Sequence, residues 1–354
     1  MSKMDKYINI DLQETYQIFE SLDIISESVK IKIDNLLECK GINHEGLIRK
    51  HQLSYDLPEL KIAMINHGYV SSNGFIHTGE GVIYSNLQFN KEMIIKQVEQ
   101  EQDNKIINID KVIPLLRAGD HIYGHWLVDI LPIVWLSRRV QDIDTYKYLV
   151  RSNIPSYAIE FLSYFNVQKS DLILIDAKTK VNFDSAIYIS NLRYNQIMHP
   201  MIKEFATELK KLILTTPTDL TTNKIYLSRG KWKSFRINKV RELINREEVE
   251  SCFQAEEYDI IYPEKYNLVE QVNIFSNIKA LAGEDGSALH NSIFMDEGTT
   301  VICLKGKKNH SIIQGSLCFA MGQNISYAIG DTKSEPSDRN SSYSIDTHDL
   351  KDLF

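Results

Sequence analysis

Residues 279–291 read KALAGEDGSALHN, and this stretch decides the fold class. Its first part, Lys279–Gly283, is an apolar run that predicts a strand, and the spacing from Gly286 to Met295 predicts a helix behind a glycine-bearing turn. In a parallel sheet such a turn lies at the carboxyl edge, where open α/β folds bind ligands. The free N–H groups of the helix N-terminus suit a diphosphate, with Gly286 allowing close approach and Ser287 adding a hydroxyl. A tight turn without a ligand is the alternative.

Strands and helices alternate around this stretch, over residues 111–214 and again over residues 224–304. Alternation of this kind predicts parallel sheets covered by helices. A polar segment rich in helix breakers, residues 215–223, separates the two runs. We therefore expect four regions: residues 1–105 as a helical and β-meander extension with its helices in residues 1–50, residues 106–215 and 216–330 as two α/β domains, and residues 331–354 as a polar tail with a closing helix.

A basic loop follows the strand predicted at Lys224–Ser228. Residues 229–236 read RGKWKSFR, so four cations, from Arg229 to Arg236, fall within eight residues of a chain whose net charge is -7. Arg229 comes first after the strand, and its guanidinium has the planar fork that binds two phosphate oxygens. The loop predicts an anionic ligand, and a solvated basic loop is the alternative.

Acidic residues mark the starts of two helices in the second α/β domain. Glu270 lies near the start of the helix predicted at Leu268–Asn277, where its carboxylate can accept hydrogen bonds from ribose hydroxyls. Stabilisation of the helix dipole is the alternative role. Asn245 and Glu248 have the spacing of a capping box, which predicts that a helix begins there.

Three titratable residues, His121, His125 and Asp129, are spaced by four. On a helix this spacing puts all three on one face, beside Tyr123 and Trp126. Such a set suits general base catalysis, in which a carboxylate orients or assists an imidazole, and it also suits metal binding. A hydrogen-bonded pair that only stabilises a half-buried helix is the alternative.

Composition narrows the class of protein. The acidic balance argues against nucleic-acid binding, which needs a basic surface. The four cysteines are far apart and form no C-x-x-C pair, so we expect reduced thiols. The N-terminus has no apolar core of a secretory signal, and no stretch approaches the roughly 18 apolar residues of a membrane span. We expect a cytoplasmic protein, with peripheral contact at the inner face of the cell membrane or with a polysaccharide assembly as a further option.

Several motifs, taken in their order along the chain, resemble those of glycosyltransferase family 61. The segment 125–132 reads HWLVDILP, and the later elements are Ser228-Arg229, Arg236, Asn245 with Glu247-Glu248, Glu270-Gln271 and residues 283–295, GEDGSALHNSIFM. The resemblance covers roughly residues 110–305. Two positions depart from the family pattern: Asp285 stands where many relatives have His, and Arg246 interrupts the usual N-E pair. A carboxylate at position 285 would repel a donor phosphate.

The resemblance implies a GT-B type architecture, in which two Rossmann-like domains face each other across a cleft. It implies an inverting hexosyl- or pentosyltransferase of the prokaryotic capsule or cell-surface polysaccharide type. The donor would be a nucleotide sugar, with UDP the expected nucleotide, and the acceptor a glycan or a lipid-linked saccharide. The nucleotide sugar is a substrate, so no cofactor is expected, and the transfer would be metal-independent.

The residue patterns and the resemblance together give each candidate residue an expected role. The donor would be bound by Arg229, Arg236, Glu270, Gly286, Ser287 and Asn291. The acceptor would be contacted by His121, Tyr123 and Trp126. Either Asp129 or His125 would be the base, with the other orienting it. Three other readings stay open: a metal-dependent hydrolase using His121, His125 and Asp129, a polysaccharide pyruvyl-type transferase, and a non-catalytic protein that binds sugar nucleotides or glycans.

Overall fold

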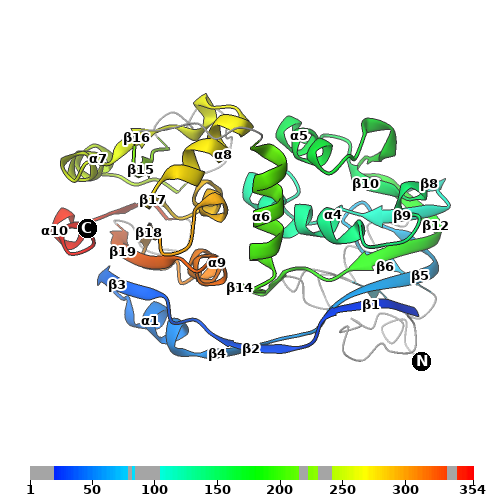
Figure 1. Ribbon diagram of the computed structural model, residues 1–354, viewed down its shortest axis with the longest axis horizontal. Helices are drawn as coiled ribbons and strands as arrows, with labels where there is room; N and C mark the ends of the chain where they lie inside the picture. Colours follow the sequence, from blue (N-terminus) through cyan, green and yellow to red (C-terminus); the bar gives the residue numbers. More distant parts are fainter. Residues whose placement is uncertain (1–19, 79–81, 84–103, 215–221, 230–240, 333–340) are drawn as a thin grey trace. The chain divides into compact units, whose positions relative to one another are not determined.

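The computed structural model describes residues 20–78, 82–83, 104–214, 222–229, 241–332 and 341–354 (Figure 1). The chain forms two compact units, one from residues 1–29 and 56–195 and the other from residues 30–55 and 196–354. The chain passes between the units near β2 (Val29–Lys32), near β4 (Ser54–Leu57) and again after residue 195. This division differs from the expected boundaries after residues 105 and 215.

The first unit contains a mixed sheet in the order β11-β10-β9-β12-β5-β6-β7, with β1 beside β5 and β8 beside β12. Strands β8 to β12 run parallel where they pair, whereas β1, β5, β6 and β7 are antiparallel to their neighbours. The strands are β1 (Glu20–Ser26), β5 (Leu60–Val70), β6 (Ile76–His77), β7 (Val82–Ile83), β8 (Lys105–Asn108), β9 (Lys111–Pro114), β10 (Lys147–Arg151), β11 (Leu172–Ile175) and β12 (Thr179–Ile189), followed by the short β13 (Arg193–Tyr194).

A buried helical segment packs against β12 of this sheet. It consists of α3 (Tyr123–His125), the π-helix η2 (Trp126–Ile130) and α4 (Leu131–Ser137), and every residue of η2 and α4 is buried. Pro132 has no amide hydrogen for the usual bond to the residue four before it. Just before the proline the helix widens, and Leu131 N donates to Trp126 O. The helix therefore changes type just before Pro132, and Asp129 lies in the π turn.

The other helices described in the first unit are short. They are the 3-10 helices η3 (Ile143–Thr145) and η4 (Lys169–Asp171) and the α-helix α5 (Ser156–Tyr164). Helix α5 packs on α4. Among the helices that the structure describes, none is long and apolar enough to cross a membrane.

The second unit contains a sheet in the order β16-β15-β17-β18-β19-β20, with β3 beside β19. All pairs are parallel except β19 with β20. The strands are β3 (Leu36–Gly41), β15 (Lys224–Leu227), β16 (Asp259–Ile261), β17 (Ala280–Glu284), β18 (Thr300–Gly306), β19 (Asn324–Thr332) and β20 (Tyr343–Ser344), with β14 (Ile197–Met198) outside this sheet. In chain order the five central strands run 2-1-3-4-5, so the winding reverses between β15 and β17. Open α/β sheets bind ligands outside the carboxyl ends of the strands at such a switch point.

Helices cover this sheet. They are α1 (Glu45–Gln52), α6 (Ile202–Ile213), α7 (Arg246–Ala255), η6 (Pro263–Lys265), α8 (Leu268–Asn277), the 3-10 helix η7 (Ser287–Phe294), α9 (Ile313–Met321) and α10 (Thr347–Lys351). Helix α7 contacts α10, and Val249, Phe253 and Leu350 form a buried cluster with Tyr226 and Ala282 of the sheet. Helices α6, α8 and α9 pack around η7.

The boundary between the two units lies before α6, because this helix packs on the second unit. We expected this helix in the first α/β domain, but its buried face contacts η7, α8 and α9 of the second unit. The buried residues are Ile202, Phe205, Ala206, Leu209 and Ile213. Removal of this face from water fixes the helix to the second unit. The polar segment 215–223 follows the helix in the chain and so marks the end of a helix, not the boundary between the units.

Two other expectations are wrong. The described part of residues 1–50 is mostly strand, because Val29-Lys30-Ile31-Lys32-Ile33 alternates with period two and buries Ile31 and Ile33. At α7 the helix begins directly after Asn245, as predicted, but Asn245 does not form the expected capping box. Its side chain instead donates to Glu248 and to Ile345 O, and accepts from Ile345 N.

Asn35, just before β3, ties residues 30–55 to the rest of the second unit. Its Nδ2 donates to Gly315 O at 3.1 Å and to Gln323 O at 2.9 Å, and its backbone carbonyl accepts from Ile325 N. We expect Asn35→Ala to lower the free energy of unfolding by about 1–3 kcal/mol, because two part-buried carbonyls lose their donor. Urea denaturation measures this. Leu37→Ala, at a side chain that is 54% exposed on the same strand, should change it by less than about 0.5 kcal/mol.

Candidate functional site

His125, Asp129 and Arg193 form one hydrogen-bonded array in the first unit. His125 Nδ1 lies 2.6 Å from Asp129 Oδ2. Arg193, from β13, donates through Nε to Asp129 Oδ1 at 2.7 Å and through Nη2 to Oδ2 at 2.8 Å. The Asp129 side chain is only 6% exposed and the Arg193 side chain 9%. A buried, two-point ion pair therefore fixes the carboxylate that holds His125.

The charge state of Asp129 follows from these contacts. Burial alone would raise the pKa of its carboxyl, but the charge of Arg193 and the hydrogen bonds from His125 and Arg193 outweigh it and hold that pKa well below its usual range. The same pair raises the pKa of Arg193, although burial opposes this. Asp129 stays ionised, and both of its oxygens are occupied.

His125 keeps one ring nitrogen available. A carboxylate can only accept, so Nδ1 carries the hydrogen and a neutral ring has its lone pair on Nε2. Nε2 makes no hydrogen bond within the described residues, and the side chain is 27% exposed. The backbone of Gly119 lies against this edge of the ring, since a Cβ there would come within 2.8 Å of Nε2. His125 is therefore oriented by one nitrogen and can accept a proton on the other.

Two further cations, the buried Arg117 and the half-buried Arg151, contact the segment that carries the array. Arg117 donates through Nη1 to the carbonyl of Asp129 at 3.1 Å and to Asn191 Oδ1 at 2.6 Å. Arg151 donates to both oxygens of Asp120. These bonds brace the turn that leads into α3 and the π turn that carries Asp129. The spacing of His125 and Asp129 was visible in the sequence, but nothing in it singled out Arg193 or Arg117.

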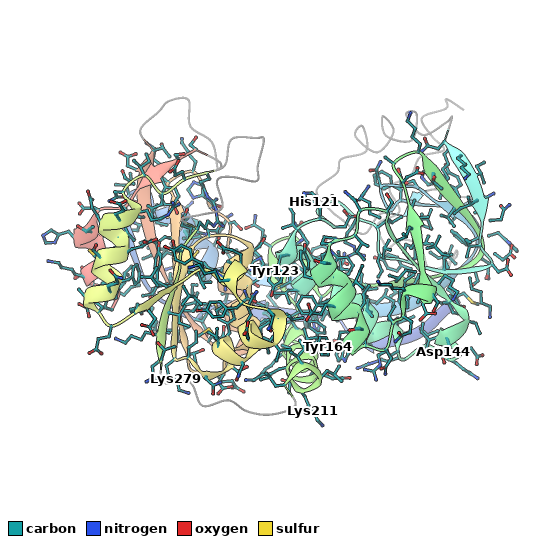
Figure 2. The ribbon with its side chains drawn as sticks, turned by 90° about the horizontal axis from the view of Figure 1, so that it is seen from above. His121, Tyr123, Asp144, Tyr164, Lys211 and Lys279 are labelled. Carbon is teal, nitrogen blue, oxygen red and sulfur yellow. The ribbon has the colours of Figure 1, made fainter. Side chains whose placement is uncertain are left out.

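The three residues expected on the acceptor side lie in different settings, and Figure 2 labels two of them, His121 and Tyr123. His121 is exposed and lies in a turn rather than on the helix, because Gly119 has φ +86° and α3 begins only at Tyr123. Tyr123 is half-buried against Tyr157, at 5.3 Å between ring centroids. Trp126 is buried, and its Nε1 donates to Asp120 O at 2.7 Å.

These settings correct two expectations. His121 does not share a helix face with His125, because the helix has not yet begun at residue 121. Trp126 belongs to the core and is not open to an acceptor, because its large apolar ring is buried and its one polar group already has a partner.

The second unit brings together residues that follow β15 and β17. Arg229, after β15, donates through Nη2 to the carbonyl of Asp285 at 2.9 Å, and Arg241 donates to the same carbonyl. Gly286 has φ +145°, and a Cβ on it would lie 2.1 Å from Arg229 Nη2. Ser287 begins η7, whose first N–H groups have no partner within the helix. Two guanidinium groups and a helix N-terminus thus gather at the switch point of the sheet.

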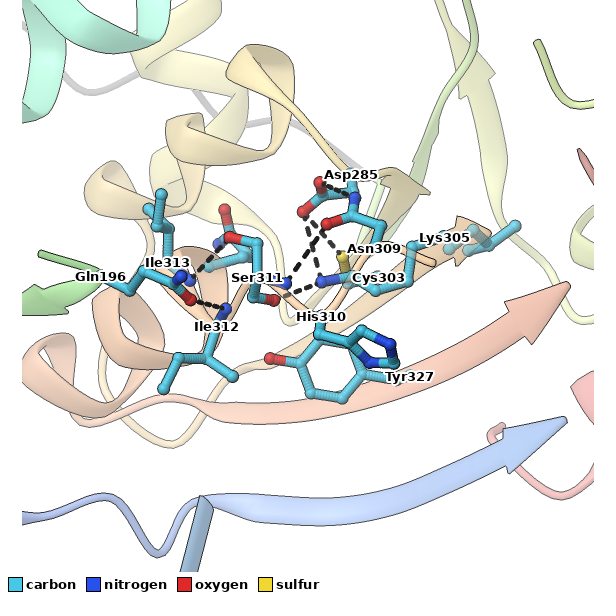
Figure 3. A network of polar contacts seen from close by, with 12 residues as sticks. Gln196, Asp285, Cys303, Lys305, Asn309, His310, Ser311, Ile312, Ile313 and Tyr327 are labelled. Atoms are coloured by element: carbon cyan, nitrogen blue, oxygen red, sulfur yellow. Dashed lines mark hydrogen bonds and ion pairs between the residues drawn. The ribbon is translucent and has the colours of Figure 1, made fainter. Parts of the chain in front are cut away.

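Asp285 itself is held on several sides (Figure 3). Asn309 Nδ2 donates to its Oδ2 at 2.7 Å, and Lys305 Nζ lies 3.6 Å from its Oδ1. Burial by itself would raise the pKa of this carboxyl, but the charges of Lys305 and Arg241 and the Asn309 bond hold it well below its usual range. Arg241 and Lys305 were not predicted, because neither lies in a recognisable pattern.

The other residues expected to bind the donor, Glu270, Asn291 and Arg236, differ in their surroundings. Glu270 caps its own helix: its Oε2 accepts from Asn267 N at 2.8 Å, and its N donates to Asn267 Oδ1 at 2.9 Å. This is the helix-stabilising alternative, although the side chain remains exposed. Asn291 is buried and donates to Ala288 O within η7. Arg236 lies outside the described residues.

The set proposed for a metal does not form. His121 lies off the helix, and the oxygens of Asp129 are taken by Arg193 and His125. Across the part of the chain that the structure describes, no three or more His, Cys, Asp or Glu side chains are grouped so that they could hold a metal ion. The geometry therefore gives the hydrolase alternative no support.

Comparison with known families gives one match. The family model described as Glycosyltransferase 61 matches residues 123–302, which is half of the chain and includes both α3 and η7. No curated protein shows significant similarity to the chain.

Replacement of Arg193 should expose the cost of the buried carboxylate. We expect Arg193→Met to lower the free energy of unfolding by about 3–5 kcal/mol at pH 7, because Asp129 would keep its charge without its main partner. The pKa of Asp129 is depressed in the folded state, so this contribution is present above pH about 4 and is lost as the pH falls further. At such low pH, the difference in the free energy of unfolding between the variant and the wild type should become smaller.

Chemical denaturation from pH 7 to pH 3 measures both effects. Arg139→Met is a matched control, because Arg139 is exposed and its guanidinium only rests 5.5 Å above the Trp135 ring. It should change the free energy of unfolding by no more than about 1 kcal/mol. If Arg193→Met has the wild-type free energy of unfolding, the ion-pair interpretation is wrong.

Gly286 should be needed for the position of Arg229. We expect Gly286→Ala to weaken binding of inorganic pyrophosphate about tenfold, because the new methyl group would displace the guanidinium. Gly298→Ala is the matched control: Gly298 also has a positive φ, +74°, but no atom lies within 4 Å of its Cβ position. It should cost stability without changing the affinity. Equal affinities of both variants, measured by calorimetry, would contradict the role of Gly286.

Proposed function

The chain belongs to glycosyltransferase family 61, and from this premise we propose an inverting transfer of a sugar from a UDP-sugar to a glycan or lipid-linked saccharide in surface polysaccharide synthesis. Membership makes the protein a glycosyltransferase, which takes precedence over the pyruvyl-transferase and non-catalytic readings. The observation that carries the proposed mechanism is the His125–Asp129–Arg193 array.

We assign the base to His125 and the orienting role to Asp129. Inversion needs one direct displacement, in which the acceptor oxygen attacks the donor sugar while a base removes its proton. Asp129 is a weak candidate, because its pKa is depressed and both of its oxygens are occupied. His125 has an available Nε2, and the Asp129 carboxylate stabilises the imidazolium that forms.

In this proposal the residues at the switch point bind the departing diphosphate. Negative charge grows on that group as the bond to the sugar breaks, and donors that are already in place stabilise it most effectively. Arg229 and Arg241 supply the charge, and the N–H groups of Ser287 and Ala288 at the start of η7 supply hydrogen bonds. These groups would take the part that a metal ion has in other sugar transferases.

The proposal also includes the GT-B arrangement that the sequence resemblance implies. The base and the diphosphate-binding residues belong to different units, so transfer requires that both units serve one pair of substrates. A peripheral place at the inner face of the cell membrane would suit a lipid-linked acceptor.

Substitution of the array tests the mechanism. We expect His125→Ala and Asp129→Asn each to lower kcat by about 10²-fold or more, because proton removal is lost or misdirected. Donor binding should survive in both, since the diphosphate-binding residues lie in the other unit. UDP release from UDP-sugars with oligosaccharide acceptors measures kcat, after a thermal-shift screen has identified the donor.

His67→Asn provides the matched control. His67 is exposed in the same unit, and its Nδ1 lies 3.7 Å from Asp184 Oδ1. This variant therefore also replaces a histidine that lies beside a carboxylate. It should keep wild-type kcat. If both array variants transfer sugar at the wild-type rate, the proposed base is wrong.

A further inference from the structure

The turn between β16 and α8, residues 262–266, borders the residues assigned to the diphosphate on two sides. β16 pairs with β15, and Ser228 N donates to Ile261 O at 2.9 Å at the end of this pair. Neighbouring strands lie about 5 Å apart, so the backbone of Tyr262 runs at that distance from Ser228, the residue before Arg229. At its other end the turn leads into α8, which packs on η7 (Figure 1). A nucleoside on this turn would therefore lie next to a diphosphate at the switch point.

The turn carries two half-buried tyrosines, Tyr262 and Tyr266. Lys265 Nζ lies 4.6 Å from the centre of the Tyr262 ring, which steadies that ring from one side. Among the residues that the structure describes, neither tyrosine hydroxyl has a hydrogen-bond partner, and the Tyr266 ring has no aromatic or cationic neighbour. A tyrosine ring has a flat apolar face and a polar edge, and nucleobases stack on such faces. The turn therefore offers aromatic surface that the fold itself does not use.

The conformation of the turn is fixed from α8. Gln271 Nε2 donates to Pro263 O at 3.1 Å and to Tyr266 O at 3.0 Å, so one amide group holds both ends of the turn. The next residues are held as well, because Asn267 and Glu270 form the capping box of α8. A surface that is ordered before the ligand arrives loses less conformational entropy on binding. The turn is thus a preorganised platform rather than a loop that a ligand must order.

We propose that residues 262–266 form the nucleoside site of the donor, where the base stacks on the rings of Tyr262 and Tyr266, and that Gln271 is a positioning residue for this turn. The proposal rests on the function assigned above to the diphosphate-binding residues, because the nucleoside is joined to that diphosphate. Gln271 touches the turn and not the ligand, so it acts on the donor through the two carbonyls that it holds.

Two probes separate this site from the diphosphate site. UDP carries both a nucleoside and a diphosphate, whereas inorganic pyrophosphate carries only the second. In titration calorimetry on the full chain, Tyr262→Ala and Tyr266→Ala should each raise the Kd for UDP about tenfold, because a stacking surface is lost. Each should change the Kd for pyrophosphate by less than about threefold. Tyr262→Phe and Tyr266→Phe should bind UDP as wild type does, because the ring and not the hydroxyl carries the base.

Gln271→Ala tests the positioning role with the same pair of probes. It should raise the Kd for UDP about fivefold or more, because the turn must then be ordered at the expense of binding, and leave the Kd for pyrophosphate within about threefold of wild type. Retained pyrophosphate binding also shows that the variant is folded. If Gln271 only stabilised the unit as a whole, the two probes would change together or not at all.

Tyr55→Ala is the matched control, because Tyr55 is also a half-buried tyrosine of the second unit, but its hydroxyl donates to Lys50 O in the segment 30–55. It should keep wild-type affinity for both probes. If Tyr262→Ala and Tyr266→Ala both bind UDP as wild type does, the nucleoside site is wrong. If wild type binds UDP no more tightly than pyrophosphate, the nucleoside site is also wrong, although the diphosphate assignment stands. If wild type binds neither probe, the diphosphate assignment fails, and the nucleoside site with it.

Discussion

A carboxylate that leaves water must be given positive partners, and this constraint shapes both candidate sites. Asp129 in the first unit is paired with Arg193 and holds His125. Asp285 in the second unit is paired with Lys305 and presents its carbonyl to Arg229 and Arg241. An uncompensated charge in either place would cost several kcal/mol, so each pair fixes its surroundings. The groups to which we assign the chemistry are the neighbours of these carboxylates.

The topology of the second unit's sheet determines where Asp285 and the cations around it lie. The winding of the sheet reverses between β15 and β17, and open α/β sheets bind ligands outside the carboxyl ends of the strands at such a point. Arg229 and Gly286 each lie two residues beyond the end of one of these two strands. The close approach of the guanidinium to the backbone requires a residue without a side chain at position 286. The glycine and the arginine, 57 positions apart in number, thus form one structural feature.

Part of each site could be predicted from local patterns. His125 and Asp129 are four residues apart on a helical segment, and their hydrogen bond is a local consequence of that spacing. The strand, glycine turn and helix around Gly286 were equally local. Glu270 shows the limit, since the same spacing that suits a ligand also suits a helix cap, and the structure uses it as a cap. Trp126 shows another, because an aromatic residue next to a catalytic candidate can equally be core.

The sequence by itself determined the α/β class, the helix that carries His125 and Asp129, and the motifs of glycosyltransferase family 61. These follow from residue spacing over a few turns, which backbone geometry converts directly into structure. Only the tertiary structure decided that Arg193, 64 residues from Asp129, completes the first array and that Lys305 and Arg241 flank Asp285. It also decided that residues 30–55 and α6 join the second unit. Burial and ion pairing depend on which distant segments exclude water together, and spacing along the chain does not contain that information.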